Sequence, residues 1–150
     1  MSNSQELNVQ QAVPFFMVKD MDASLQFYID RLGFELKNTW TPRGRIEWCW
    51  LQLGNASIML QEHGKESSEH GKVYLENKKG LGVSICFQCT DAIALYHEFK
   101  SKGIDVSEPF VGNSLWDIKI ADPDNYNLHF ESPTDVPEKT KYSDWIKTNS

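Results

Sequence analysis

The sequence predicts an α+β protein built from two tandem modules, each with the order strand, helix, strand, strand, strand. Three observations predict this fold: an internal repeat, alternation of apolar and polar residues in short segments, and a glycine after each predicted helix. The 150 residues, 40% of them hydrophobic, suffice for one compact domain or two small modules that share a core.

Each half of the repeat begins with a short apolar strand and a helix. The two stretches are "VPFFMVKDMDASLQFYIDRLGF" (13–34) and "GVSICFQCTDAIALYHEFKSKGI" (82–104). An aspartate, Asp22 or Asp91, lies just before or inside each helix start, and Gly33 or Gly103 follows each helix end. Apolar stripes at helical spacing complete the pattern, with Leu25, Ile29 and Leu32 in the first helix and Ala92, Leu95 and Phe99 in the second.

The last strands of the two halves also match. "NASIMLQE" (55–62) aligns with "NYNLHFES" (125–132), so that Met59 takes the place of His129. Two strand-like segments precede each of them: "FELKNTW" and "RIEWCWLQLG" in the first half, and "IDVSEPF" and "LWDIKIAD" in the second. Each module therefore has its own helix to cover one face of its own sheet.

These patterns divide the chain into five parts. We expect a flexible N-terminus over residues 1–10, a first module over 11–62, a joining loop over 63–80, a second module over 81–133 and a tail over 134–150. The polar loop is longer than a simple connector and suits a lid, a dimer arm or a solvated linker. The tail either docks as a short helix or stays free.

Composition excludes several classes of function. Fifteen basic and 21 acidic residues give a net charge of -6, which argues against nucleic acid or an anionic membrane as partner. There is no apolar run long enough to span a membrane and no signal peptide at the polar start. Three cysteines without a pattern (Cys49, Cys86, Cys89) indicate no disulfide framework, so the expected compartment is the cytoplasm.

Two motifs in order, at the spacing of the repeat, resemble a known superfamily. "AVPFFMVKDMDASLQFYIDRLGFEL" is similar to the first strand and helix, and "IADPDNYNLHFESP" to the turn before the last strand, of the glyoxalase, bleomycin-resistance and extradiol-dioxygenase proteins, also called vicinal oxygen chelate proteins. The resemblance covers about residues 11–133 and implies two βαβββ modules that form a curled, half-open barrel, usually completed in a homodimer. Asn125 stands where a glycine is usual, which asparagine tolerates because it accepts a left-handed φ.

The resemblance also implies where a metal would bind. The four ligand positions of metal-using members fall on Val13, Met59, Gly82 and His129. A divalent ion needs three or four nitrogen or oxygen donors, and only one imidazole is present, so we expect no metal and no cofactor. A displaced site that uses Gln61 and Glu131 is the alternative.

Two interpretations of His129 remain open. It lines a pocket, with its ring bonded to Glu131 or a backbone carbonyl, or it acts as a base that Glu131 orients, although no third member of such a relay is evident. We expect His63, His70 and His97 to be solvated and the cysteines to serve packing.

Strand phase predicts the residues that line the cavity. Side chains on the face away from the helices alternate with core residues such as Leu51 and Leu53. The expected ligand-binding residues are Phe15, Trp40, Trp48, Trp50, Met59, Gln61, Ser84, His129 and Glu131, with Met17, Gln52 and Cys86 on the same face. The alternative is that the indoles only fill the core.

We therefore expect a metal-free, homodimeric binding protein that sequesters an aromatic or hydrophobic small molecule, as the antibiotic-resistance members of the superfamily do. The net charge and Glu131 favour a cationic group on that ligand. The alternative is an enzyme, a lyase, isomerase or dioxygenase with a non-standard site around His129 and Glu131. Binding without catalysis is the preferred interpretation.

Overall fold

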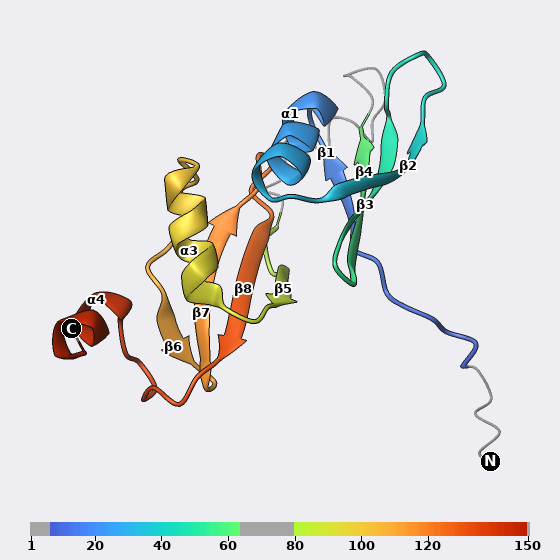
Figure 1. Cartoon of the computed structure of the whole chain (residues 1–150). Coiled ribbons are helices and arrows are strands. Elements are labelled where there is room, and N and C mark those ends of the chain that lie inside the picture. The colour runs from blue at the N-terminus through green and yellow to red at the C-terminus, as the bar shows by residue number, and fades with distance from the viewer. Residues whose placement is uncertain (1–6, 64–79, 150) are drawn as a thin grey trace.

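Two four-stranded sheets form the scaffold of the protein, and helices cover one face of each (Figure 1). The computed structural model describes residues 7–63 and 80–149. The first sheet has the order β1-β4-β3-β2 and the second β5-β8-β7-β6. In both, the first strand of the module runs parallel to the last and the other pairs are antiparallel. The predicted α+β fold is confirmed, and the sheets stay open rather than closing into one barrel.

The first module contains four strands and one continuous helical segment. The strands are β1 (Phe15–Val18), β2 (Glu35–Trp40), β3 (Trp48–Leu53) and β4 (Ala56–Glu62). Helix α1 (Met21–Leu25) continues into the π-helical turn η1 (Gln26–Arg31).

The second module repeats this plan with a longer regular helix. Its strands are β5 (Ser84–Gln88), β6 (Phe110–Gly112), β7 (Leu115–Ala121) and β8 (Asn127–Pro133). Helix α3 (Ala92–Ser101) connects β5 to β6.

Aspartates cap the helices of both modules, and Asp22 lies inside the start of the first helix, as expected. The Asp91 side chain accepts a hydrogen bond from Ala94 N and caps α3. In the first module Asp20, not Asp22, caps the helix by accepting from Ala23 N, so the strand-to-helix connection is shorter there. Gly33 and Gly103 follow the helices with φ of 86° and 73°, as their predicted helix-ending role requires.

Strand β6 is shorter than the sequence pattern suggested. Of "IDVSEPF", only Phe110 belongs to a strand, and residues 102–109 have no regular strand structure. Pro109 supplies no N–H for a ladder, which explains why pairing starts only after it. Ser107 nevertheless contacts β7, because its N–H donates to Lys119 O and its hydroxyl accepts from Lys119 N.

The two modules share one hydrophobic core. A single buried cluster includes side chains from both, and Phe34 of the first packs edge-on against Phe87 of the second. Phe16 stacks on Tyr126 with ring centroids 4.1 Å apart, and Tyr126 donates its hydroxyl to Met17 O. Aromatic packing therefore joins the two modules, and the strands described for one do not pair with those of the other.

The turn before β8 has the conformation that its sequence predicts. Asn125 lies in the left-handed region with φ of 67°. Asp122 is 3% exposed, and one of its carboxylate oxygens accepts hydrogen bonds from the N–H groups of Asp124 and Tyr126. Its other oxygen accepts from the Tyr28 hydroxyl at 2.7 Å, which links the turn to the first module.

The tail docks as a helix, which was one of its two expected states. Helix α4 (Tyr142–Thr148) packs through Trp145 on Trp116, with ring centroids 5.7 Å apart. At the other end of the chain, residues 7–12 extend away from the sheets (Figure 1). No helix within the described ranges is both long and apolar enough to cross a membrane.

Most of the joining loop lies outside the described residues, because residues 64–79 and with them His70 are not described. The lid and dimer-arm hypotheses therefore stay predictions. His63 corrects the expectation of a solvated ring: it is 7% exposed, and its backbone N–H donates to the Val18 carbonyl. His97 is exposed on α3 as expected.

Candidate functional site

The helix-free face of the first sheet carries the predicted aromatic residues in two adjacent rows. Strand register places Phe15 beside Met59 and Met59 beside Trp50 in one row. In the next row, Met17, Gln61, Trp48 and Trp40 follow one another across all four strands. The sheet thus presents a continuous surface of aromatic and thioether side chains with one amide among them.

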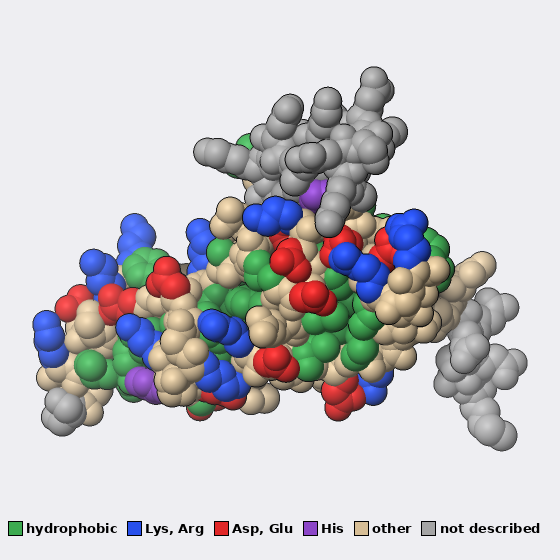
Figure 2. Space-filling model, turned by 90° about the horizontal axis from the view of Figure 1, so that it is seen from above, with side chains coloured by type: hydrophobic (Ala, Val, Ile, Leu, Met, Phe, Trp, Pro, Cys, Tyr) green, Lys and Arg blue, Asp and Glu red, His purple; other side chains and the backbone are tan. Residues whose placement is uncertain are grey.

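These side chains are incompletely covered by the rest of the protein. Trp48, Trp50 and Met59 are partly buried, whereas Phe15 and Trp40 are 51% and 53% exposed. The alternating residues Leu51, Ile58 and Leu60 are fully buried on the helix side, as strand phase predicts. Figure 2 shows that hydrophobic side chains reach the surface of the molecule between acidic and basic ones.

The helix-free face of the second sheet is polar at the matching positions. One row contains Gln88, Glu131 and Asp117, and the next contains Cys86, His129 and Lys119. Because Asp117 pairs with Glu131 as Trp48 pairs with Gln61, the repeat places a carboxylate where the first module has an indole. The two faces are therefore chemically complementary: one is aromatic and the other is ionisable.

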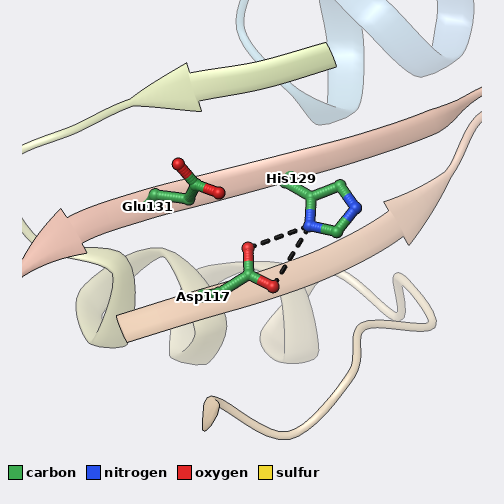
Figure 3. A group of neighbouring side chains, drawn as sticks. All are labelled: Asp117, His129 and Glu131. Carbon is green, nitrogen blue, oxygen red and sulfur yellow. Dashed lines mark hydrogen bonds and ion pairs between the residues drawn. The ribbon is translucent and has the colours of Figure 1, made fainter. Parts of the chain in front are cut away.

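Asp117, His129 and Glu131 converge on one point of this polar face (Figure 3). The Nδ1 atom of His129 lies 2.9 and 3.1 Å from the two carboxylate oxygens of Asp117, so Nδ1–H donates to that carboxylate. The side chains of His129 and Asp117 are 22% and 31% exposed. In the neutral tautomer this bond leaves Nε2 as the acceptor nitrogen.

The partner of His129 differs from the one expected. We anticipated Glu131 or a backbone carbonyl, but the ring binds Asp117 on the neighbouring strand. Glu131 instead accepts a hydrogen bond from Gln88 Nε2 at 2.7 Å. The reason is geometric, since Asp117 is the diagonal cross-strand neighbour of His129, and such neighbours come within reach on the face of an antiparallel pair.

Asp117 is thus the residue that sequence reasoning missed. The signal was available, because Trp116, Ile118 and Ile120 alternate as core residues along β7 and leave Asp117 on the open face. In strand register Asp117 takes the place of Trp48, which was one of the predicted ligand-binding residues. With Asp117, a carboxylate–imidazole pair is present for the relay that lacked a third member.

The cysteines are free and differ in environment. Burial raises the pKa of the Cys49 thiol to about 11, consistent with a packing role. Cys86 is exposed on the polar face, where burial of the sulfur and then the adjacent Glu131 carboxylate raise the pKa of its thiol. Ser84, also predicted for the site, is exposed on the same strand, two residues from Cys86, and pairs with Asn127.

The four positions implied for a metal do not form a donor set. Met59 lies beside Phe15 and His129 beside Cys86 in strand register, whereas Val13 and Gly82 lie just before β1 and β5. The expectation that these positions hold no metal stays a prediction.

Three cavities of about 520 to 620 Å³ open on the described part of the chain, and one of them is lined by Cys86 and Gln88 of the polar face. One separates η1 from the end of β7, one lies between the β3–β4 turn and β5, and one between α3 and α4. None of the three is lined by Trp48, Trp50 or His129.

Comparison with solved structures shows the same fold in antibiotic-binding proteins. TnmS3, an antibiotic binding protein from Streptomyces sp. CB03234, matches with a TM-score of 0.63 at 17% identity, over 86% of this chain and 100% of that one. A bleomycin-binding protein in complex with bleomycin matches with a TM-score of 0.61 at 22% identity, over 83% and 98% of the two chains.

Comparison by sequence connects the chain to an enzyme and to a family. It is 26% identical to a lactoylglutathione lyase of Schizosaccharomyces pombe, with 85% of this chain covered; it spans about half (49%) of that relative's length. The family model of the glyoxalase/bleomycin resistance protein/dioxygenase superfamily matches residues 10–130. The resemblance found in the sequence is thereby confirmed, and the chain belongs to the glyoxalase/bleomycin resistance protein/dioxygenase superfamily.

Proposed function

We propose that this protein binds and sequesters a small aromatic or hydrophobic molecule that carries a cationic group, and that it does so without a metal ion. The observation that carries the proposal is the surface formed by Trp48, Trp50, Met59 and Phe15, which the helices of its own chain leave open. Apolar and aromatic walls with a few polar groups are the usual composition of a ligand site.

Stacking on the indoles supplies part of the affinity. An indole stacked against a cationic or aromatic ring contributes about 0.5–2 kcal/mol. A micromolar ligand needs about 8 kcal/mol in all, so burial of apolar area and one or two polar contacts must add to the indoles. Such burial requires a second wall opposite the aromatic face.

A second copy of the chain supplies that wall in our proposal. Several large hydrophobic side chains are more than half exposed in one subunit, including Leu7, Val9, Leu81 and Val83. Exposed apolar surface of this extent favours association. A homodimer would let an aromatic face meet the polar face that carries Asp117, His129 and Glu131. The three free cysteines suit the reducing cytoplasm expected from the sequence.

The polar face selects the charge of the ligand. Asp117 and Glu131 are adjacent carboxylates in one row, and His129 is already bonded to Asp117. Carboxylates on a partly buried surface attract an ammonium or guanidinium group and disfavour an anion. We therefore expect planar cationic aromatics to bind better than neutral or anionic analogues of equal size.

Titration with bleomycin and a panel of planar cationic aromatics, followed by tryptophan fluorescence, tests the proposal. We expect Trp48→Ala and Trp50→Ala each to weaken the binding of a responding compound by about 2- to 30-fold, the equivalent of 0.5–2 kcal/mol. Trp145→Phe, on the docked tail, is the matched control and should leave affinity unchanged. Equal affinity in the wild type and both alanine variants would show that the indoles only fill the core.

A chelator separates the metal-free mode of binding from a metal-dependent one. Affinity for the responding compound should not fall on treatment with EDTA. Loss of binding on chelation, with recovery on adding back one divalent ion, would contradict the proposal.

The contact between His129 and Asp117 favours one second candidate, an enzyme. A carboxylate that holds Nδ1–H orients the imidazole so that Nε2 can serve as a general base. The test is turnover of the glutathione adduct that a lactoylglutathione lyase uses. Activity that is lost in both His129→Ala and Asp117→Asn would replace sequestration by catalysis.

A further inference from the structure

Three metal-ligating side chains meet on the polar face of the second sheet, and none of the roles given above needs all three. One donor atom from each of Asp117, His129 and Glu131 lies within 4.8 Å of the other two. Asp117 and Glu131 are direct cross-strand partners, and His129 is two residues before Glu131 on β8. Figure 3 shows Nδ1, rather than Nε2, turned toward the carboxylates.

We propose that these three side chains form a binding site for a divalent first-row transition ion, with His129 Nδ1 and one oxygen each of Asp117 and Glu131 as ligands. Bonds of about 2.0–2.2 Å to an ion place neighbouring donors about 3 Å apart. The 2.9 Å between Nδ1 and Asp117 Oδ1 already matches this spacing, and a rotation of the Glu131 side chain closes the rest. Solvent would occupy the remaining coordination positions.

Polar and charged groups surround Glu131, the third proposed ligand. Gln88 Nε2 donates to one oxygen of Glu131, and the Cys86 thiol also bonds to this carboxylate. Partners of this kind fix the orientation of a ligating carboxylate. Lys119 lies beside His129 in strand register and opposes a cation, but its side chain is exposed and extends into solvent. The two carboxylates give the site a net negative charge that outweighs this one ammonium at short range.

This site differs in construction from the set of four positions that the family resemblance implies. It shares only His129 with that set and takes all its ligands from the second module. The corresponding positions of the first module carry Trp48, Met59 and Gln61, which offer no comparable set. Equivalent positions of the repeat therefore carry ionisable side chains in the second module and mainly apolar and aromatic ones in the first.

The chemistry of the donors predicts which ions bind. One imidazole and two carboxylates suit Zn²⁺, Ni²⁺, Co²⁺ and Mn²⁺, with Mn²⁺ the weakest of these by the usual order of affinity. Mg²⁺ and Ca²⁺ prefer oxygen ligands alone and should bind much more weakly. The ion takes the place of the proton on Nδ1, which passes to the buffer, so uptake weakens as the pH falls.

Calorimetric titration of the chelator-treated protein with Zn²⁺ and Mn²⁺, in two buffers of different ionisation enthalpy, tests the proposal. We expect one ion per chain, proton release on binding, and Zn²⁺ tighter than Mn²⁺. Asp117→Asn, His129→Ala and Glu131→Gln should each weaken Zn²⁺ binding at least tenfold. Gln88→Ala, which removes only the orienting amide, should weaken it by roughly tenfold.

Matched substitutions elsewhere keep the test specific. Asp105→Asn and Glu98→Gln remove exposed carboxylates outside the cluster and should change Zn²⁺ affinity less than twofold. Circular dichroism of each variant shows that it is folded. Absence of Zn²⁺ binding by the wild type at 100 micromolar, about -5.5 kcal/mol, or equal binding by wild type and the three cluster variants, would overturn the proposal. Neither result bears on whether the aromatic face binds a small molecule.

Discussion

At the scale of single residues, Asp122 shows how one carboxylate can be held by hydrogen bonds and still be costly to charge. Burial raises the pKa of Asp122 from 3.8 to about 6, although hydrogen bonds from Tyr28, Tyr126 and Asp124 oppose that rise. Burial of the ring, and then the contact with Asp122, raise the pKa of Tyr28 well above its usual value. The pair joins the first module to the turn before β8, so its charge affects how the modules hold together.

The raised pKa predicts the direction in which stability changes with pH. Between pH 3.8 and about 6 the folded protein holds a proton at Asp122 that the unfolded chain has lost, so this residue's contribution to stability falls as pH rises through that window. The total loss is on the order of 3 kcal/mol. Because Asp122→Asn cannot ionise, the free energy of unfolding of wild type minus variant should fall from pH 4 to pH 7.

Urea denaturation of the wild type and of Asp122→Asn at four pH values measures this difference in the free energy of unfolding. The contributions of the other carboxylates are common to both proteins and cancel in the difference. A difference that is flat would show that burial does not dominate at Asp122. A difference that rises with pH would show that the three hydrogen bonds outweigh burial.

At the scale of elements, α4 depends on the surface beneath it. A helix of seven residues is too short to be stable by itself in water. Trp145 packs on Trp116, and the N–H groups of Ser143 and Tyr142 donate to Glu108 Oε1 and Pro109 O. We expect Trp145→Ala to lower stability by about 3 kcal/mol and to remove the protection of α4 amides in hydrogen exchange. Ile146→Ala, at an exposed position, should do neither. Retained protection of α4 in the Trp145 variant would show that other contacts anchor it.

The paired strands β7 and β8 carry a second prediction. If the cluster of Asp117, His129 and Glu131 receives both a cationic ligand group and a divalent ion, the two must compete. Adding Zn²⁺ should therefore weaken binding of a planar cationic aromatic, while the same addition leaves Asp117→Asn unaffected. Fluorescence titrations at several Zn²⁺ concentrations measure the effect, and tighter ligand binding with Zn²⁺ would indicate that the ion bridges protein and ligand instead.

At the scale of the whole molecule, the open sheet faces predict association. Light scattering at micromolar concentration should give about twice the chain mass of 17.3 kDa, because the exposed aliphatic and aromatic side chains lose contact with water in a dimer. Dilution should release monomers and shift tryptophan emission to the red as Trp40, Trp48 and Trp50 become solvated. A monomer mass at micromolar concentration would contradict the prediction.

The sequence by itself determined the architecture of each module. Local signals suffice for this: apolar alternation defines β3, β4, β7 and β8, and a glycine with positive φ ends each helix. Strand phase also placed Trp48, Trp50 and Met59 on the open face. Where a local rule failed, at the strand expected over 104–110, the competing cause was also local, namely a proline.

Only the tertiary structure decided which side chains meet. The contact of His129 with Asp117 depends on the register between β7 and β8, and the bond from Tyr28 to Asp122 joins residues 94 positions apart. The burial of His63 likewise depends on its surroundings rather than on its polar neighbours in sequence. Periodicity specifies the face on which a residue lies, but pairing and burial depend on distances set by the packing of the whole chain.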